Sequence, residues 1–130
     1  SSFVTDGYKR KYGLTWLSNN EVSNEAYERD PRCGFRFTFN GFYSFFRGIQ
    51  RANRQESAGQ LPKSFPLLFI AGAGDPVGNN GKGVEAVYRR YLSHGASASI
   101  KLYPGDRHEI LNELDRETVY ADITNWINKE

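Results

Sequence analysis

A short apolar run in the second half of the chain limits the possible folds more than any other feature. Residues 67–71 are apolar without interruption, follow Pro66 and precede the glycine-rich stretch 72–83. A run of this length between turn signals is typical of a parallel strand that is buried on both faces. We therefore expect a central strand of a parallel sheet at this position.

The segments that follow continue a pattern of strand, helix, strand and helix. Apolar residues recur with helical spacing over 84–92, and Gly95 then supplies a left-handed residue that ends a helix. Residues 97–103 alternate in polarity and stop at Pro104, which predicts a second strand nearer the sheet edge. A closing helix is expected over about 117–128. The βαβ unit implies an α/β fold with parallel strands joined by a crossover helix.

The first sixty residues have a different character, because aromatic side chains crowd there. Phe42, Phe46 and Ile49 have helical spacing, and Asn40 is a suitable N-cap. We therefore expect a helix over about 41–53. No sheet pattern is convincing in this half of the sequence.

A polar, loop-like segment over residues 55–62 divides the chain into two regions. We expect a mainly helical lid or cap region over residues 1–62. Residues 63–130 then form the α/β portion, which contains both predicted strands.

Composition excludes several classes of function. The formal net charge of +2 is small and interspersed, so we expect no nucleic-acid partner. The cluster of Arg47, Arg51 and Arg54 is typical of a solvated helix face. No apolar run approaches the ~20 residues that span a bilayer, so we expect no transmembrane segment. A single cysteine, Cys33, is typical of a protein from a reducing compartment, which favours a cytoplasmic location. We expect this cysteine to be buried and inert.

The beginning of the chain also bears on the interpretation. It opens with Ser1 and Ser2, and the sequence contains no methionine and no signal-like segment at this end. A cleaved expression tag would explain this opening, but the motifs described next favour a fragment of a longer protein.

Two residues with acid and base chemistry follow the two predicted strands. Asp75 comes after the first strand and His108 comes after the second. Because the carboxyl ends of parallel strands open at one edge of a sheet, we expect these side chains to meet there. A carboxylate that accepts a hydrogen bond from one imidazole nitrogen fixes the tautomer, so that the other nitrogen can take a proton from a serine hydroxyl. The pair therefore predicts two members of a catalytic triad.

Other titratable residues have less specific interpretations. Asp106 is a rival acid, but it lies in a turn two residues from His108, and we expect it to point elsewhere or to cap the next segment. His94 stands at the end of a predicted helix, where an imidazolium interacts favourably with the helix dipole, so a structural role is expected.

The serine nucleophile of a triad is missing from this sequence. Residues 95–99 lack the second glycine of the Gly-x-Ser-x-Gly motif and precede a strand rather than a helix.

Known nucleotide and metal motifs do not match. Val77 stands where a dinucleotide fingerprint starting at Gly72 needs a glycine, and Pro76 and Gly83 break the phosphate-loop pattern. One cysteine and two histidines have no recognisable ligand spacing. We therefore expect no metal and no cofactor.

The motifs in this order resemble the end of the serine hydrolases related to monoacylglycerol lipases and lysophospholipases, the serine aminopeptidase S33-like group of α/β-hydrolases. The resemblance covers nearly the whole chain, and its upstream part is similar to the lid of that group. It implies that Asp75 is the triad acid, that His108 is the general base and that the nucleophile lies outside this sequence. The motifs that carry it are Trp16-Leu17-Ser18, Asp30-Pro31-Arg32-Cys33-Gly34-Phe35, Phe37-Thr38, residues 67–74 with Asp75-Pro76-Val77, Tyr103-Pro104-Gly105, and Arg107-His108-Glu109-Ile110-Leu111-Asn112-Glu113.

The resemblance implies a serine ester hydrolase as the parent protein, with a long-chain acyl ester such as a monoglyceride or lysophospholipid as its substrate. An apolar lid suits a chamber for an acyl chain, and the candidates for substrate contact are Phe35, Phe37, Phe42 and Phe46. Packing between lid helices is the alternative for each ring. We expect this chain to be inactive alone and to associate with the missing N-terminal core or a second copy. A non-catalytic interaction or folding module is the alternative function.

Overall fold

A computed structural model describes residues 13–57 and 62–129, and the features below are those of these residues. The elements follow one another in the order α2 (Glu21–Arg29), α3 (Phe39–Ser57), β1 (Pro66–Gly72), α4 (Lys82–Ser93), β2 (Ser97–Tyr103), the 3-10 helix η1 (Ile110–Asn112) and α5 (Arg116–Ile127).

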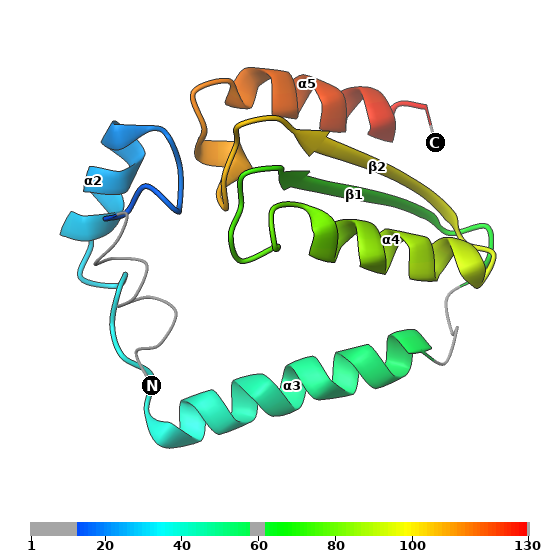
Figure 1. The fold of residues 1–130 in the computed structure, drawn as a ribbon, viewed down its shortest axis with the longest axis horizontal. Coiled ribbons are helices and arrows are strands. Elements are labelled where there is room, and N and C mark those ends of the chain that lie inside the picture. Colours follow the sequence, from blue (N-terminus) through cyan, green and yellow to red (C-terminus); the bar gives the residue numbers. More distant parts are fainter. Residues whose placement is uncertain (1–12, 58–61, 130) are drawn as a thin grey trace.

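The two strands lie side by side and run parallel, with Pro66 opposite Ser97 and Gly72 opposite Tyr103. Helix α4 connects them across one face of this sheet, and α5 covers the other face (Figure 1). The predicted strand, crossover helix and strand are confirmed, and the second strand has the predicted bounds. The closing helix, α5, begins and ends one residue earlier than predicted.

Strand β1 is less buried than its apolar sequence suggests. All of its residues except Gly72 are half-buried, whereas the apolar run predicted a strand buried on both faces. The reason is that, in the part of the chain described, β1 has a neighbouring strand on one edge only. Phe69 packs against α4, where its ring centre lies 5.5 Å from that of Tyr91. Ile70 packs against the core on the other side of the sheet.

The hydrophobic core lies between the sheet and α5. Tyr103, Ile110 and Val119 are buried there together, and Ile70 and Ile123 pack against them from β1 and α5. Because Tyr103 ends β2 and Ile110 begins η1, the core lies directly beneath the loop that carries His108. The position of this loop is therefore tied to the packing of α5.

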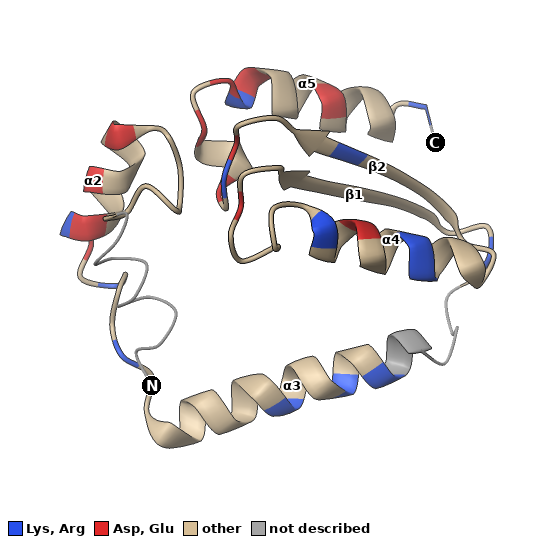
Figure 2. Ribbon diagram, viewed as in Figure 1, with Lys and Arg blue, Asp and Glu red and all other residues tan. Residues whose placement is uncertain are grey.

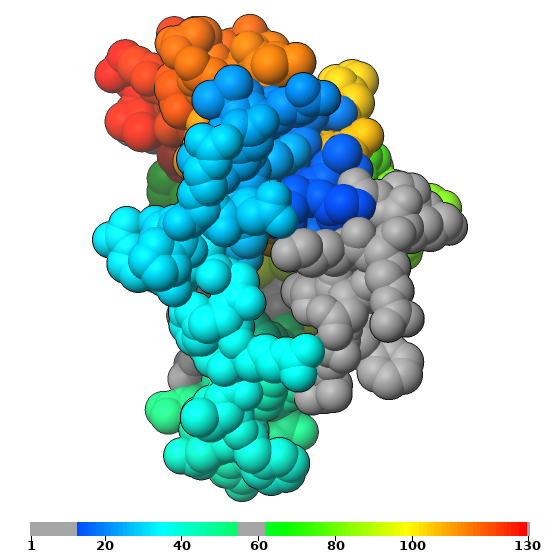
Figure 3. All heavy atoms as spheres, turned by 90° about the vertical axis from the view of Figure 1, so that its left-hand side faces the viewer, coloured from blue at the N-terminus to red at the C-terminus, as the bar shows by residue number. Residues whose placement is uncertain are grey.

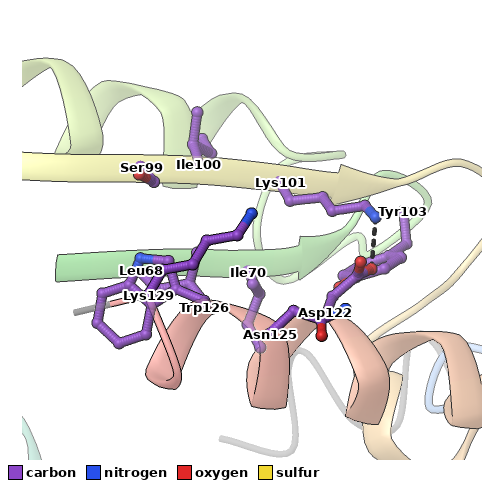
Figure 4. Close-up of a pocket in the computed structure, with 10 residues that line it drawn as sticks. All are labelled: Leu68, Ile70, Ser99, Ile100, Lys101, Tyr103, Asp122, Asn125, Trp126 and Lys129. Atoms are coloured by element: carbon purple, nitrogen blue, oxygen red, sulfur yellow. Dashed lines mark hydrogen bonds and ion pairs between the residues drawn. The ribbon is translucent and has the colours of Figure 1, made fainter.

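Polar contacts also fasten α5 to β2, beside an open pocket between the sheet and the helix (Figure 4). The carboxylate of Asp122 accepts hydrogen bonds from the hydroxyl of Tyr103, at 3.0 Å, and from the ammonium group of Lys101. Burial and the bond to Asp122 raise the pKa of Tyr103 to about 12. The bonds from Lys101 and Tyr103 lower the pKa of Asp122.

Helix α3 lies apart from the sheet (Figure 1) and is longer at both ends than predicted. It begins at Phe39, so Asn40 lies inside its first turn, and the predicted N-cap at Asn40 was wrong. Thr38 takes that role instead, because its hydroxyl oxygen accepts a hydrogen bond from the backbone N–H of Gly41 at 3.1 Å.

The arginines of α3 at positions 47, 51 and 54 lie on the side of the helix that is turned away from the sheet (Figure 2). Arg47, Arg51 and Arg54 are all exposed, as predicted for a solvated face. Within residues 13–57 and 62–129, no helix is both long and apolar enough to cross a membrane.

Candidate active site

The structure brings Asp75 and His108 together at the carboxyl ends of the two strands. The Nδ1 atom of His108 lies 3.1 Å from Oδ2 of Asp75, a distance at which a protonated Nδ1 donates to the carboxylate. The Asp75 side chain is 10% exposed and that of His108 is 40% exposed. The carboxylate is thus sheltered from water, while the imidazole remains reachable from outside.

The loop after β1 holds the Asp75 carboxylate in a fixed orientation. Its other oxygen, Oδ1, accepts a hydrogen bond from the backbone N–H of Val77 at 2.8 Å. The backbone oxygen of Asp75 accepts from the N–H of Asn80, also at 2.8 Å. Asn79, Asn80 and Gly81 all have positive φ, a conformation that asparagine and glycine tolerate best. This turn closes the loop around the acid before α4 begins.

The loops that carry the acid and the histidine are in direct backbone contact. The N–H of Gly74 donates to the carbonyl oxygen of Asp106 at 2.8 Å. A Cβ atom on Gly72 would lie 2.3 Å from the carbonyl oxygens of both Asp106 and Arg107. Glycine is therefore required at position 72 for the two loops to approach closely enough for the hydrogen bond between Asp75 and His108.

Asp106 is buried, and the His108 imidazole is bonded to Asp75 instead. Burial, followed by the nearby carboxylates of Asp115 and Glu113, raises the pKa of Asp106 to about 6. Its Oδ2 atom has no hydrogen-bond partner among the described residues. The rival acid thus points elsewhere, as expected from its place in the turn.

Residues 15–19, called here the root segment, lie against the loop that carries His108. The ring of Trp16 has its centre 5.4 Å from that of the His108 imidazole, tilted by 39°. The backbone oxygen of Leu17 accepts from the N–H of Glu109 at 2.8 Å, and the Arg107 guanidinium donates to the backbone oxygen of Thr15. Figure 3 shows this contact from the side, where the blue segment borders the orange one.

Glu113 is a residue of the site to which the sequence analysis assigned no role. Its side chain is almost fully buried, with 1% of the residue exposed. Oε2 accepts hydrogen bonds from the Ser18 hydroxyl at 2.9 Å and the Asn19 backbone N–H at 2.8 Å. Oε1 accepts from the Asn19 side-chain amide at 3.2 Å and the Arg107 backbone N–H at 2.9 Å. The only signal for it in the sequence was its place in the motif that follows the histidine.

The four phenylalanines proposed for substrate contact gather in one cluster near the start of α3. The ring centre of Phe37 lies 5.4 Å from those of Phe35 and Phe42, and the rings of Phe42 and Phe46 are stacked 6.2 Å apart. The start of α3 is at the same end of the molecule as the loops after β1 and β2 (Figure 1). These ring contacts are made within the cluster, whereas the imidazole of His108 packs against Trp16.

Two other residues singled out in the sequence lie outside this site. His94 caps the C-terminal end of α4, where its Nδ1 lies 2.8 Å from the carbonyl oxygen of Arg90, and Gly95 follows with a φ of +81°. Cys33 is half-buried, so the expectation of a buried thiol was wrong. It lies in the exposed turn between α2 and α3, which explains its partial exposure.

Comparison with known proteins places this geometry in context. The sequence model of a family described as serine aminopeptidase, S33, matches residues 2–115. No curated protein matches the chain. Among solved structures, a highly thermostable carboxyl esterase from Bacillus coagulans, in complex with glycerol, is similar with a TM-score of 0.78 and 32% sequence identity. The match covers 94% of this chain and 42% of the esterase, so the chain spans less than half the length of that protein.

Proposed function

This chain belongs to the serine aminopeptidase S33 family, and on that premise we propose that it is the C-terminal part of a serine ester hydrolase and supplies the acid and the base of the triad. The family and the α/β-hydrolase fold predicted from the sequence are both confirmed. The observation that carries the proposal is the 3.1 Å hydrogen bond between His108 Nδ1 and Asp75 Oδ2 at one edge of the parallel strand pair.

The mechanism follows from the two nitrogen atoms of His108. Asp75 accepts from Nδ1–H, which fixes the tautomer and leaves Nε2 free as the base. A serine from the remainder of the protein attacks the ester carbonyl carbon while its proton passes to Nε2, and Asp75 stabilises the resulting imidazolium. The imidazolium then protonates the leaving alcohol, and water hydrolyses the acyl-enzyme with the same base. No step requires a cofactor.

Esters, rather than peptides, are the substrates that we propose. A solved structure that this chain resembles is a carboxyl esterase. Long acyl chains, as in a monoglyceride or a lysophospholipid, are supported by the cluster of Phe35, Phe37, Phe42 and Phe46, because binding sites for such chains are mostly apolar. The predicted lid over residues 1–62 would place these rings beside the acyl group.

The proposal is tested with the full-length protein and three substrates: a short-chain and a long-chain p-nitrophenyl ester, and an aminoacyl p-nitroanilide. We expect both esters to be hydrolysed, and His108→Gln and Asp75→Asn to lower kcat/KM by about 10³-fold or more. Glu117→Gln is the matched control, since that side chain is 81% exposed on α5. Preferential cleavage of the anilide, or full activity in both site variants, would contradict the proposal.

The role of the aromatic cluster is tested by chain-length selectivity. Phe37→Ala in the full-length protein is expected to raise KM for the long-chain ester by about tenfold, because burial of a phenyl ring is worth more than 1 kcal/mol, with a smaller effect on the short-chain ester. Phe65→Ala is the control, since that ring is similarly exposed but lies outside the cluster. Equal changes for both esters would show that the rings do not contact the acyl chain.

We further propose that the 130-residue chain alone is inactive, because the nucleophile belongs to another part of the protein. The measurement is turnover of a p-nitrophenyl ester by the isolated chain, which we expect to be indistinguishable from that of His108→Gln in the same chain. Turnover that a fluorophosphonate abolishes would reveal a nucleophile within residues 1–130. The cytoplasmic location stays a prediction.

A further inference from the structure

We propose that Glu113 is a positioning residue for the base: it fastens the root segment against the histidine loop, and thereby keeps the Trp16 indole in contact with the His108 imidazole. This inference rests on the proposed function, in which His108 is the base. It adds a residue that acts through others rather than on the substrate.

The hydrogen bonds of Glu113 join two parts of the chain that are far apart in sequence. Ser18 and Asn19 donate from the root segment, 95 and 94 positions away, while Arg107 donates from the residue next to His108. All these donors are neutral: a hydroxyl, a side-chain amide and two backbone N–H groups. A buried carboxylate is tolerated only where hydrogen bonds replace its hydration, so these donors must stay in place.

The same two segments hold His108 from two directions. On one side, the backbone N–H of Arg107, the preceding residue, is bonded to Glu113 Oε1. On the other side, Trp16 lies two residues before Ser18 and packs its ring against the imidazole. Asp75 fixes the Nδ1 atom, and the indole restricts the plane of the ring. Without the Glu113 bonds, the root segment would still be joined to this loop by backbone bonds such as those from Glu109 to Leu17 and from His108 to Trp16. The indole would then be held less firmly against the imidazole.

Glutamine cannot replace Glu113 in this arrangement. Each carboxylate oxygen accepts two hydrogen bonds, so an amide NH2 in place of either oxygen would face two donors. The Arg107 and Asn19 backbone N–H groups cannot turn away or become acceptors. We therefore expect Glu113→Gln to loosen the root segment from the histidine loop while the side chain at position 113 keeps its size.

The contact between Trp16 and His108 provides a direct readout, because a protonated imidazole quenches the fluorescence of an indole that it touches. The chain contains two tryptophans, so Trp126→Phe leaves Trp16 as the sole tryptophan, which is excited selectively. In that background we expect emission to fall when His108 is protonated at low pH, a change called here the quenching step. His108→Gln should abolish this step, and Glu113→Gln should lose most of its amplitude.

Two further variants separate positioning from general loss of stability. Tyr91→Ala removes a ring contact between α4 and Phe69 on the other face of the sheet. It destabilises the fold but leaves the bonds of Glu113 intact, so it should retain the full quenching step. Asn19→Asp places a second carboxylate beside Oε1 and changes an exposed residue, so it tests the contact if Glu113→Gln does not fold. It should also lose the step.

The inference is overturned if Glu113→Gln and Asn19→Asp keep the parent amplitude, or if Tyr91→Ala loses as much amplitude as they do. It is also overturned if the emission of the parent does not change when His108 is protonated. In the full-length enzyme, Glu113→Gln should lower kcat by about 10- to 100-fold with little change in KM, as expected for a misplaced base. An enzyme without esterase activity would refute the proposed function, and the fluorescence result would still decide the role of Glu113.

Discussion

A glycine beneath the two loops is as important for the geometry of the site as the acid and the base. Gly72→Ala is expected to lower the free energy of unfolding by about 3 kcal/mol, because the added methyl group would overlap backbone oxygens that cannot move aside. Gly48→Ala in α3 has open space around it and should stabilise the helix by about 0.5–1 kcal/mol. Urea unfolding of both variants measures the difference, and equal effects would contradict the close packing of the loops.

Asp106 makes stability depend on pH. Its pKa is raised to about 6, so the folded state binds this proton more tightly than the unfolded state does. The stabilisation that results is fully present below about pH 4 and is lost as the pH rises through about 6. Asp106→Asn should therefore exceed the parent in free energy of unfolding by up to about 2 kcal/mol at pH 8 and differ little at pH 4. A difference that is constant between these pH values would show that Asp106 is not the cause.

Residues whose role depends on distant partners were the least predictable from the sequence. The proximity of Asp75 and His108 could be predicted because each follows a strand, and parallel strands bring such loops together. Glu113 could not, because its donors Ser18 and Asn19 lie more than ninety positions away and have no pattern that reveals them. Thr38 was passed over for Asn40 because both residue types cap helices, and only the backbone decides between them.

At the scale of elements, periodicity predicted the strand pair and its crossover helix, since both patterns are local. The burial of β1 was overestimated. Its apolar run is typical of a strand that is covered on both faces and has a neighbouring strand on each edge, whereas β1 has one neighbouring strand among the described residues. The extent of α3 was underestimated because its polar last turns lack an apolar face by which to recognise them.

Helix α5 is expected to loosen from β2 at alkaline pH. The pKa of Tyr103 is raised to about 12, so the stabilisation from its neutral hydroxyl is fully present below about pH 10 and is lost as the pH rises through about 12. Tyr103→Phe should cost about 1 kcal/mol at pH 8, through the lost bond to Asp122, and should converge with the parent by pH 12. Unfolding midpoints at both pH values test this, with Tyr43→Phe on exposed α3 as the control. A cost that persists at pH 12 would contradict it.

At the scale of the whole molecule, the apolar surface of α3 requires a partner. Phe39, Phe45 and Phe46 are 90%, 55% and 61% exposed, and patches of this kind mark surfaces that contact another protein or another part of the same one. We expect the isolated chain to self-associate, and the double change Phe45→Glu with Phe46→Glu to reduce the associated fraction. Size-exclusion chromatography with light scattering measures it, with Arg51→Glu on the charged side as the control. A folded monomer in the parent would contradict this prediction.

The central claim is that Asp75 and His108 activate a serine that lies elsewhere in the protein. Its most direct test is the rate at which a fluorophosphonate labels that serine in the full-length enzyme. We predict that His108→Gln and Asp75→Asn each slow labelling by about 10³-fold or more, and that Asp106→Asn labels at the parent rate. Labelling that is unchanged in His108→Gln, or that depends on Asp106 rather than Asp75, would contradict the assignment.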